Sequence, residues 1–323
     1  MAPAPSVNPK AEASTDRPVW IDTDMGFDDL AAILMVAASR PIAGLSLVAG
    51  NVVLPQAERN ALAAASLFSW DFPIHAGAAA PLKATLETAH YVLGADGMPG
   101  KGRKLPTVAG QALGDATGAL VSFIEAGGRE ILALGPLTNF AHLAEARPDV
   151  LTLPDLRLVW MGGSAGPGNH TAAAEFNAAV DPEAVAALVA AGVRISMVGL
   201  DCCRQVTVTL DDVAPLRACP SERGQLLADL LEGYVRIADD GQRPMALYDP
   251  VAAAAVAAPE TVTFAPARLD VELDGTLTRG MTVIEWRARK AAPNALIATT
   301  ANAPCIRELM QAALLRAAEG QHR

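Results

Sequence analysis

Residues 19–30 read VWIDTDMGFDDL, and this stretch places four carboxylates within eight residues, those of Asp22, Asp24, Asp28 and Asp29. The apolar run in front of the acids is typical of a buried strand, and an apolar segment of good helix formers follows from Leu30 to Ala38. We therefore expect a strand, a tight turn at Gly26 and a helix that begins at Asp28 or Asp29. One Asp at such a place caps the helix and meets the positive end of its dipole.

Four carboxylates are more than helix capping needs. Acids this close together repel one another, so at least one of them should have a raised pKa. No Lys or Arg stands between Arg17 and Arg40 to neutralise them locally. A hard divalent cation is the simplest remedy, because calcium and magnesium bind carboxylate oxygens readily. The stretch therefore favours a metal site over a solvated loop with a capped helix.

An aspartyl phosphatase also places Asp-x-Asp directly after its first strand. That pattern carries a small hydroxyl residue two places beyond the second Asp. Here that place is occupied by Gly26, and two more acids follow. The phosphatase interpretation is therefore the weaker one.

The composition excludes several classes of protein. The chain has 323 residues, a net charge of −10 and a pI near 5.0, which argues against a nucleic-acid or anionic-membrane surface. No uncharged apolar run reaches the roughly 20 residues of a membrane span. The four cysteines contain no CxxC pair, so we expect no zinc site and reduced thiols in a cytoplasm.

The first 17 residues, MAPAPSVNPKAEASTDR, lack the apolar middle section of a signal peptide. We interpret residues 1–17 as a disordered tail and residues 18–323 as a single domain.

Strand-like and helix-like segments alternate along the chain. This order predicts an α/β fold with an open, mostly parallel sheet, helices on both faces and a Rossmann-like core. Residues 77–110 are rich in Gly and Pro and are predicted as loops. After the first strand, we expect strands at 45–51, 73–76, 130–134, 156–161 and 193–198. Further helices are expected at 56–68, 111–125, 222–239, 249–257 and 303–318, and another opens at Asp181-Pro182.

Nearly every expected strand ends in Gly followed by a small polar residue. The carboxyl ends of parallel strands form the ligand crevice of an open sheet. Polar groups should therefore gather on one edge, from Asp24, Asn51, Thr138 or its neighbours, Met161 and Asp201.

Two later segments add candidate binding groups. Residues 162–169 form a Gly-rich loop without the Lys of a P-loop, so a mobile loop that borders the site is the better interpretation. Asn169 is followed by Glu175-Phe176-Asn177, whose polar groups suit a polyhydroxylated ligand; loop-stabilising hydrogen bonds are the structural alternative. Tyr248-Asp249-Pro250 opens a helix, where Asp249 can serve as both cap and metal ligand.

The motifs DTDMGFDD, VAGN, ALGPLTN, MGG, N-x5-EFN, VDPEA, DP and RGMT together resemble the inosine–uridine-preferring nucleoside hydrolases. They run in the family's order from residue 19 to about residue 282. The resemblance implies a ribonucleoside N-ribohydrolase that uses Ca²⁺ and yields ribose and a free base. It also implies a role in purine or pyrimidine salvage and a homodimer or homotetramer.

The resemblance assigns roles to individual residues. Asp24, Asp29, the carbonyl of Leu134 and Asp249 match the calcium ligands, and Asp24 also matches the general base on the attacking water. The ribose-binding groups are matched by Asp28, Asn51, Met161, Asn169, Glu175, Phe176, Asn177 and Asp249. Asp22 matches a supporting acid behind the site. Chemically, the C–N bond should break through an oxocarbenium-like state, with calcium holding the ribose diol and the water.

The chain departs from the family pattern at two places. Family members carry a His directly before the last Asp as the proton donor to the leaving base, and here that residue is Tyr248. They also carry a His-Gly pair where this chain has Leu93-Gly94. Tyr248 could donate a proton, pack on the base, or be a core tyrosine at a helix start. These losses motivate one rival function, a non-catalytic nucleoside- or ribose-binding protein on the same scaffold.

Overall fold

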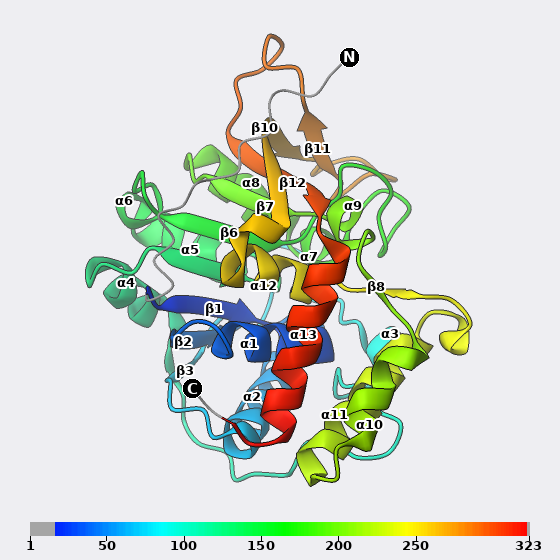
Figure 1. Cartoon of the computed structure of the whole chain (residues 1–323). Coiled ribbons are helices and arrows are strands. Elements are labelled where there is room, and N and C mark those ends of the chain that lie inside the picture. The colour runs from blue at the N-terminus through cyan, green and yellow to red at the C-terminus, as the bar shows by residue number, and fades with distance from the viewer. Residues whose placement is uncertain (1–16, 322–323) are drawn as a thin grey trace.

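The computed structural model describes residues 17–321, so the expected disordered tail lies outside the described residues apart from Arg17. A ten-stranded sheet forms the centre, in the order β11-β10-β12-β7-β6-β5-β1-β2-β3-β4 (Figure 1). The eight strands from β12 to β4 in this order pair in parallel, and β10 and β11 add an antiparallel edge. The predicted α/β class with a mostly parallel sheet is therefore confirmed.

The strands of this sheet are β1 Val19–Thr23, β2 Ile42–Leu47, β3 Ile74–Ala76, β4 Gly114–Asp115, β5 Glu130–Ala133, β6 Arg157–Met161, β7 Ile195–Val198, β10 Val262–Val271, β11 Thr282–Glu285 and β12 Ala295–Ala301. A separate antiparallel pair joins β8 Thr207–Val208 to β9 Met245–Ala246. The α-helices are α1 Phe27–Ala37, α2 Leu54–Phe68, α3 His90–Leu93, α4 Ala116–Glu125, α5 Thr138–Ala146, α6 Pro148–Leu151, α7 Phe176–Val180, α8 Pro182–Ala190, α9 Leu200–Cys203, α10 Ala214–Ala218, α11 Glu222–Arg236, α12 Asp249–Ala257 and α13 Ala303–Ala318.

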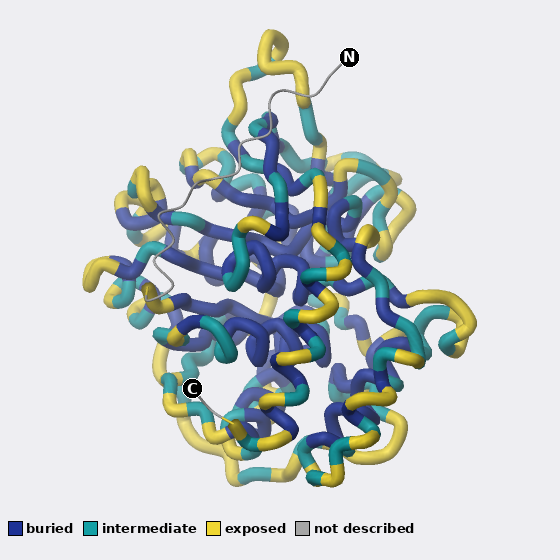
Figure 2. Tube along the Cα trace, viewed as in Figure 1, coloured by how far each residue is buried: buried dark blue, intermediate teal, exposed yellow. Residues whose placement is uncertain are grey.

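The central strands are buried on both faces, which explains their continuous apolar runs. Side chains alternate between the two faces of a strand. In β1, Val19 and Ile21 join the core under α1, α11, α12 and α13, while Trp20 joins the core under α4, α5 and α8. In Figure 2 the middle strands of the sheet are mostly buried, and many of the exposed residues lie in the loops around them. Within residues 17–321, no helix combines the length and apolarity needed to cross a membrane.

The structure differs from the sequence prediction in several places. The strand expected at 45–51 is β2, which spans Ile42–Leu47 and ends before Gly50-Asn51. Helix α1 begins at Phe27 because Gly26 is its N-cap and Asp29 bonds back to the Gly26 backbone. The helix expected from residue 111 begins at Ala116 instead, because Asp115 caps it by accepting a hydrogen bond from the Gly118 N–H. The predicted loop region 77–110 contains the short helix α3, and strands β10 to β12 were not expected.

The order of the strands in the sheet indicates where the candidate site lies. The chain leaves β1 toward β2 on one side, and it returns to the other side of β1 as β5. Ligands of open α/β sheets bind beyond the carboxyl ends of the strands at such a reversal. The acidic stretch follows β1, and Leu134 follows β5, so both lie at this point.

Candidate active site

The turn between β1 and α1 sets the position of the acids. Met25 adopts a left-handed φ of 55°, and its carbonyl accepts a hydrogen bond from the Asn60 amide. Gly26 itself is extended, but a Cβ there would stand 2.9 Å from the Asn51 amide nitrogen. The expected turn is therefore made by Met25, and Gly26 is needed because Asn51 packs against it.

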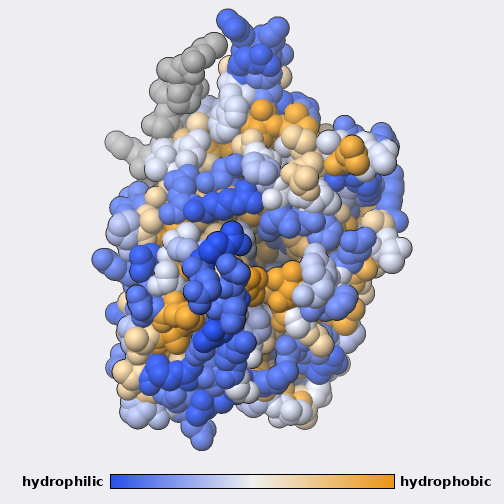
Figure 3. Space-filling view, turned by 90° about the vertical axis from the view of Figure 1, so that its right-hand side faces the viewer, coloured by the Kyte–Doolittle hydropathy of each residue, from blue (hydrophilic) through white to orange (hydrophobic). Residues whose placement is uncertain are grey.

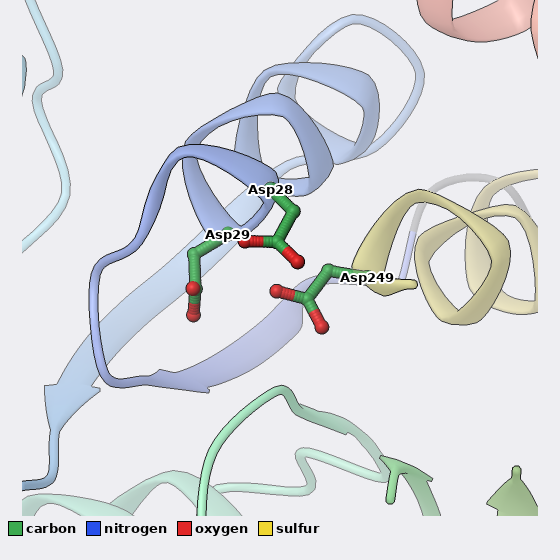
Figure 4. A group of neighbouring side chains, drawn as sticks. All are labelled: Asp28, Asp29 and Asp249. Atoms are coloured by element: carbon green, nitrogen blue, oxygen red, sulfur yellow. The ribbon is translucent and has the colours of Figure 1, made fainter. Parts of the chain in front are cut away.

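Three carboxylates meet at the floor of the site. Asp28 and Asp29 come from the first turn of α1 and Asp249 from the first turn of α12, and their ligand atoms lie within 4.8 Å of one another. In Figure 4, Asp28 and Asp249 point toward each other and Asp29 lies beside them. Asp24 joins this group through Asn51, whose side-chain nitrogen lies 2.9 Å from Asp24 Oδ1 and 3.4 Å from Asp29 Oδ2.

The electrostatics of these acids fit a bound cation. Burial, and then the charge of Asp29, raises the pKa of Asp28 to about 7. Burial also raises the pKa of Asp24, Asp29 and Asp249, and for Asp249 the neighbouring carboxylates add to the effect. No Lys or Arg within residues 17–321 forms an ion pair with any of the four, and Asp28 Oδ1 is buried without a hydrogen-bond partner. A divalent cation would supply the missing charge and the missing partner.

One cavity of about 640 Å³ opens above these acids. Figure 3 views the face that carries α3, α9 and β8, and it shows a hollow near the middle with apolar surface along one border. Leu134, Tyr248 and every residue predicted to bind ribose line the cavity: Asp28, Asn51, Met161, Asn169, Glu175, Phe176, Asn177 and Asp249. Asp24 and Asp29 are fully buried and do not line it.

The predicted ribose-binding groups are held in fixed orientations. The Asn177 side-chain amide donates to the carbonyl oxygens of Leu134, at 2.8 Å, and Met161, at 3.0 Å, which leaves its own oxygen free for a ligand. Glu175 caps α7 by accepting from the N–H groups of Asn177 and Ala178, and it also accepts from Gly163. Burial raises the pKa of Glu175 to about 7 although these donors act in the opposite direction. The site is thus preorganised.

The Gly-rich loop is fastened to its surroundings. Thr282 donates to the Ser164 carbonyl and accepts from the Ser164 N–H. Asp201 accepts a hydrogen bond from the Ala165 N–H. Arg204 donates to the carbonyls of Pro167 and Gly168. The glycine content indicated a mobile loop, but hydrogen bonds from segments far away in the sequence hold this loop in place.

Tyr248 lines the same cavity as the predicted ribose-binding residues. It directly precedes α12 and is only partly exposed. Burial raises the pKa of Tyr248, and the Arg204 charge and a side-chain hydrogen bond with Asn169 act in the opposite direction. The phenol is therefore protonated at neutral pH and lines the cavity.

Some sequence-predicted residues lie elsewhere. Thr138 and Asp201 do not line the cavity. Thr138 donates a hydrogen bond to Asp181, and Asp201 holds the Gly-rich loop. Asp22 lies behind the site, where it accepts hydrogen bonds from the side chains of Ser46 and Asn139. The cavity also contains polar residues that no motif indicated: Tyr91, His170, Arg204, Thr207, Tyr234 and Arg243.

Comparison with known proteins agrees with this geometry. The family model for inosine-uridine preferring nucleoside hydrolases matches residues 19–308. A non-specific ribonucleoside hydrolase of Klebsiella pneumoniae is 37% identical over 290 residues, which cover 87% of this chain and 92% of the relative. A pyrimidine-specific ribonucleoside hydrolase of Shewanella woodyi is 35% identical over 277 residues, or 83% of this chain and 88% of the relative.

Solved structures of nucleoside hydrolases also resemble this chain. A purine-preferring ribonucleoside hydrolase from Gardnerella vaginalis superposes with a TM-score of 0.84 at 25% identity, covering 94% of this chain and 99% of that one. A plant nucleoside hydrolase superposes with a TM-score of 0.82 at 27% identity, covering 92% and 98%. The predicted enzyme class, a ribonucleoside N-ribohydrolase, is confirmed. The chain belongs to the family of inosine-uridine preferring nucleoside hydrolases.

Proposed function

We propose that this chain hydrolyses the N-glycosidic bond of ribonucleosides with one bound calcium ion, through an oxocarbenium-like transition state. One observation carries the proposal: every residue predicted to bind ribose lines a single cavity, and the carboxylate cluster forms its floor. We also propose that residues 18–323 act as one domain, because strands from Val19 to Ala301 share one sheet. The family resemblance further supports a homodimer or homotetramer in the cytoplasm.

The calcium ligands would be Asp29, Asp249, Asp24 and the Leu134 carbonyl, and Asp28 lies close enough to contribute. Oxygen ligands of this kind suit calcium. The ion would orient the ribose hydroxyls and the attacking water by templating and Lewis acidity.

The chain's own residues bind and orient the sugar. Asn51 and Asn177 would present amides to the ribose, Asn169 and Glu175 would hold the 5′-hydroxyl, and Met161 would pack on the ring. The support is that all five residues line the cavity. The nearby carboxylates favour the positive charge that develops on the sugar.

Asp24 is proposed as the general base that takes the proton of the attacking water. Its carboxylate is held by the Asn51 N–H at 2.6 Å and by the Asn51 side chain at 2.9 Å. In the chain without metal, burial raises the pKa of Asp24. Tyr248 is proposed to face the leaving base as a proton donor or as a packing surface.

The test is a panel of purine and pyrimidine ribosides with reducing sugar as the readout, on protein with measured calcium content. We expect ribose release, about one calcium per chain, and loss of activity after chelation that calcium restores. Tight nucleoside binding without ribose release would instead support a binding protein, and zinc as the only metal would contradict the calcium site.

A further inference from the structure

The candidate cavity is lined by groups of opposite charge in different places. Its carboxylates, Asp28, Glu175 and Asp249, are buried. Its guanidinium groups, Arg204 and Arg243, are exposed on the wall formed by the segments that lead into β8 and β9. Within residues 17–321, the Arg243 side chain forms no ion pair. The cavity thus changes from negative at the ribose end to positive at the wall.

Arg204 is held in place while part of its guanidinium remains available. Nη1 donates to the Pro167 carbonyl at 2.9 Å, and Nη2 donates to the Gly168 carbonyl at 2.8 Å. A guanidinium carries five N–H donors, so about three remain for a ligand. Arg204 and Tyr248 both line the cavity that the predicted ribose-binding residues line.

We propose that Arg204 contacts the base of the bound nucleoside and stabilises the negative charge that develops on it during bond cleavage. This inference rests on the proposed function and deepens it. The pair of electrons in the bond between C1′ and the base nitrogen goes to the base, and the water oxygen forms the new bond to C1′. The water proton goes to Asp24, and the departing base takes a proton from Tyr248 or from solvent.

The proposal specifies a substrate class. An Arg donates hydrogen bonds only, so it suits a base with a carbonyl oxygen conjugated to the glycosidic nitrogen. Uracil, cytosine, hypoxanthine and guanine have such an oxygen, whereas adenine presents an amino group instead. Arg204 should thus favour oxo-substituted bases over adenine, and it takes on part of the role of the histidine that Tyr248 replaces.

The experiment compares kcat/KM of wild type and Arg204→Gln on two substrates. One is uridine or inosine, whichever the wild type hydrolyses faster, and the other is a nitrophenyl riboside, whose leaving group needs little stabilisation. We expect the natural substrate to slow by about 10- to 100-fold, as for the loss of one charge-assisted hydrogen bond, and the activated riboside to change by less than about threefold. Arg204→Lys keeps the charge and should recover part of the loss.

Asp201→Asn is the matched control, because Asp201 holds the same loop through Ala165 but does not line the cavity. Loosening the loop should affect both substrates equally. Equal losses on both substrates for Arg204→Gln, or no loss on the natural one, would overturn the role of Arg204. A wild type that releases no ribose from any nucleoside would instead overturn the proposed function itself.

Discussion

The carboxylate cluster predicts that Asp249→Asn changes stability with opposite signs in the absence and presence of calcium. The ligand atoms of Asp28, Asp29 and Asp249 lie within 4.8 Å of one another. At that separation and an effective dielectric constant of about 20, each pair of ionised carboxylates repels by about 3.5 kcal/mol. Without metal, replacing one carboxylate with an amide should therefore stabilise the protein.

Protonation relieves part of the repulsion, because burial and the neighbouring charges raise the pKa of Asp249. We therefore expect a net gain of about 1–2 kcal/mol at pH 8 in a chelator, or a Tm higher by about 2–8 °C. In calcium, we expect the wild type to be more stable than Asp249→Asn. At 100 times its Kd it stabilises the wild type by about 2.7 kcal/mol, whereas a variant with 100-fold weaker binding gains only about 0.4 kcal/mol.

The assay is thermal unfolding of wild type and Asp249→Asn at pH 8, each in chelator and in excess calcium. Asp155→Asn is the control, since it removes the same charge from an exposed ion pair with Arg129 and should change stability little in either buffer. A lower Tm for Asp249→Asn in chelator, together with an unchanged calcium increment, would refute the assignment of this cluster as a metal site.

Three further predictions concern the pH dependence of stability, the general base Asp24 and the role of Tyr248 toward the leaving nucleobase. In chelator, the folded state keeps protons on Asp22 and Asp28 up to a pKa of about 7, whereas the unfolded chain releases them near pH 4. The Tm should thus fall as the pH rises from about 4 to 7, less steeply in Asp28→Asn, and a Tm that rises over this window would contradict the raised pKa values. Asp24→Asn should reduce turnover by about 10²- to 10⁴-fold in calcium-loaded protein, and a normal rate would exclude Asp24 as the base. If Tyr248 donates a proton, Tyr248→Phe should slow a natural nucleoside strongly and a nitrophenyl riboside hardly at all; if it only packs, both rates stay near wild type. Equal large losses on both would mean that the substitution disturbs Asp249.

The sequence predicted the element order of the parallel part of the sheet well, because these segments carry local signals. Helix α13 was predicted with its observed bounds, and β5 and β6 to within one residue of theirs. The antiparallel edge strands β10 and β11 were missed, as was the neighbouring strand β12. In β10, for instance, Pro266 interrupts the strand pattern.

The acidic stretch shows how much of the candidate site a local sequence pattern can predict. Four carboxylates at the end of a buried strand, without a nearby cation in the sequence, indicate a metal site from charge repulsion alone. The motif series then identified the family and predicted which residues bind ribose. Which acids lie together depends on tertiary packing: α12 lies against α1, and this contact brings Asp249 to Asp28 and Asp29.

The cavity wall that we propose to face the leaving base could be found only from the tertiary structure. Arg204 and Arg243 belong to no motif, and a single Arg in a polar segment carries no signal of its own in the sequence. The pairing of β8 with β9 brings their segments together, and hydrogen bonds to Pro167 and Gly168 fix Arg204 beside the Gly-rich loop. Strand ends and helix caps are local properties that a sequence displays, whereas the meeting of distant side chains at a cavity wall depends on long-range packing.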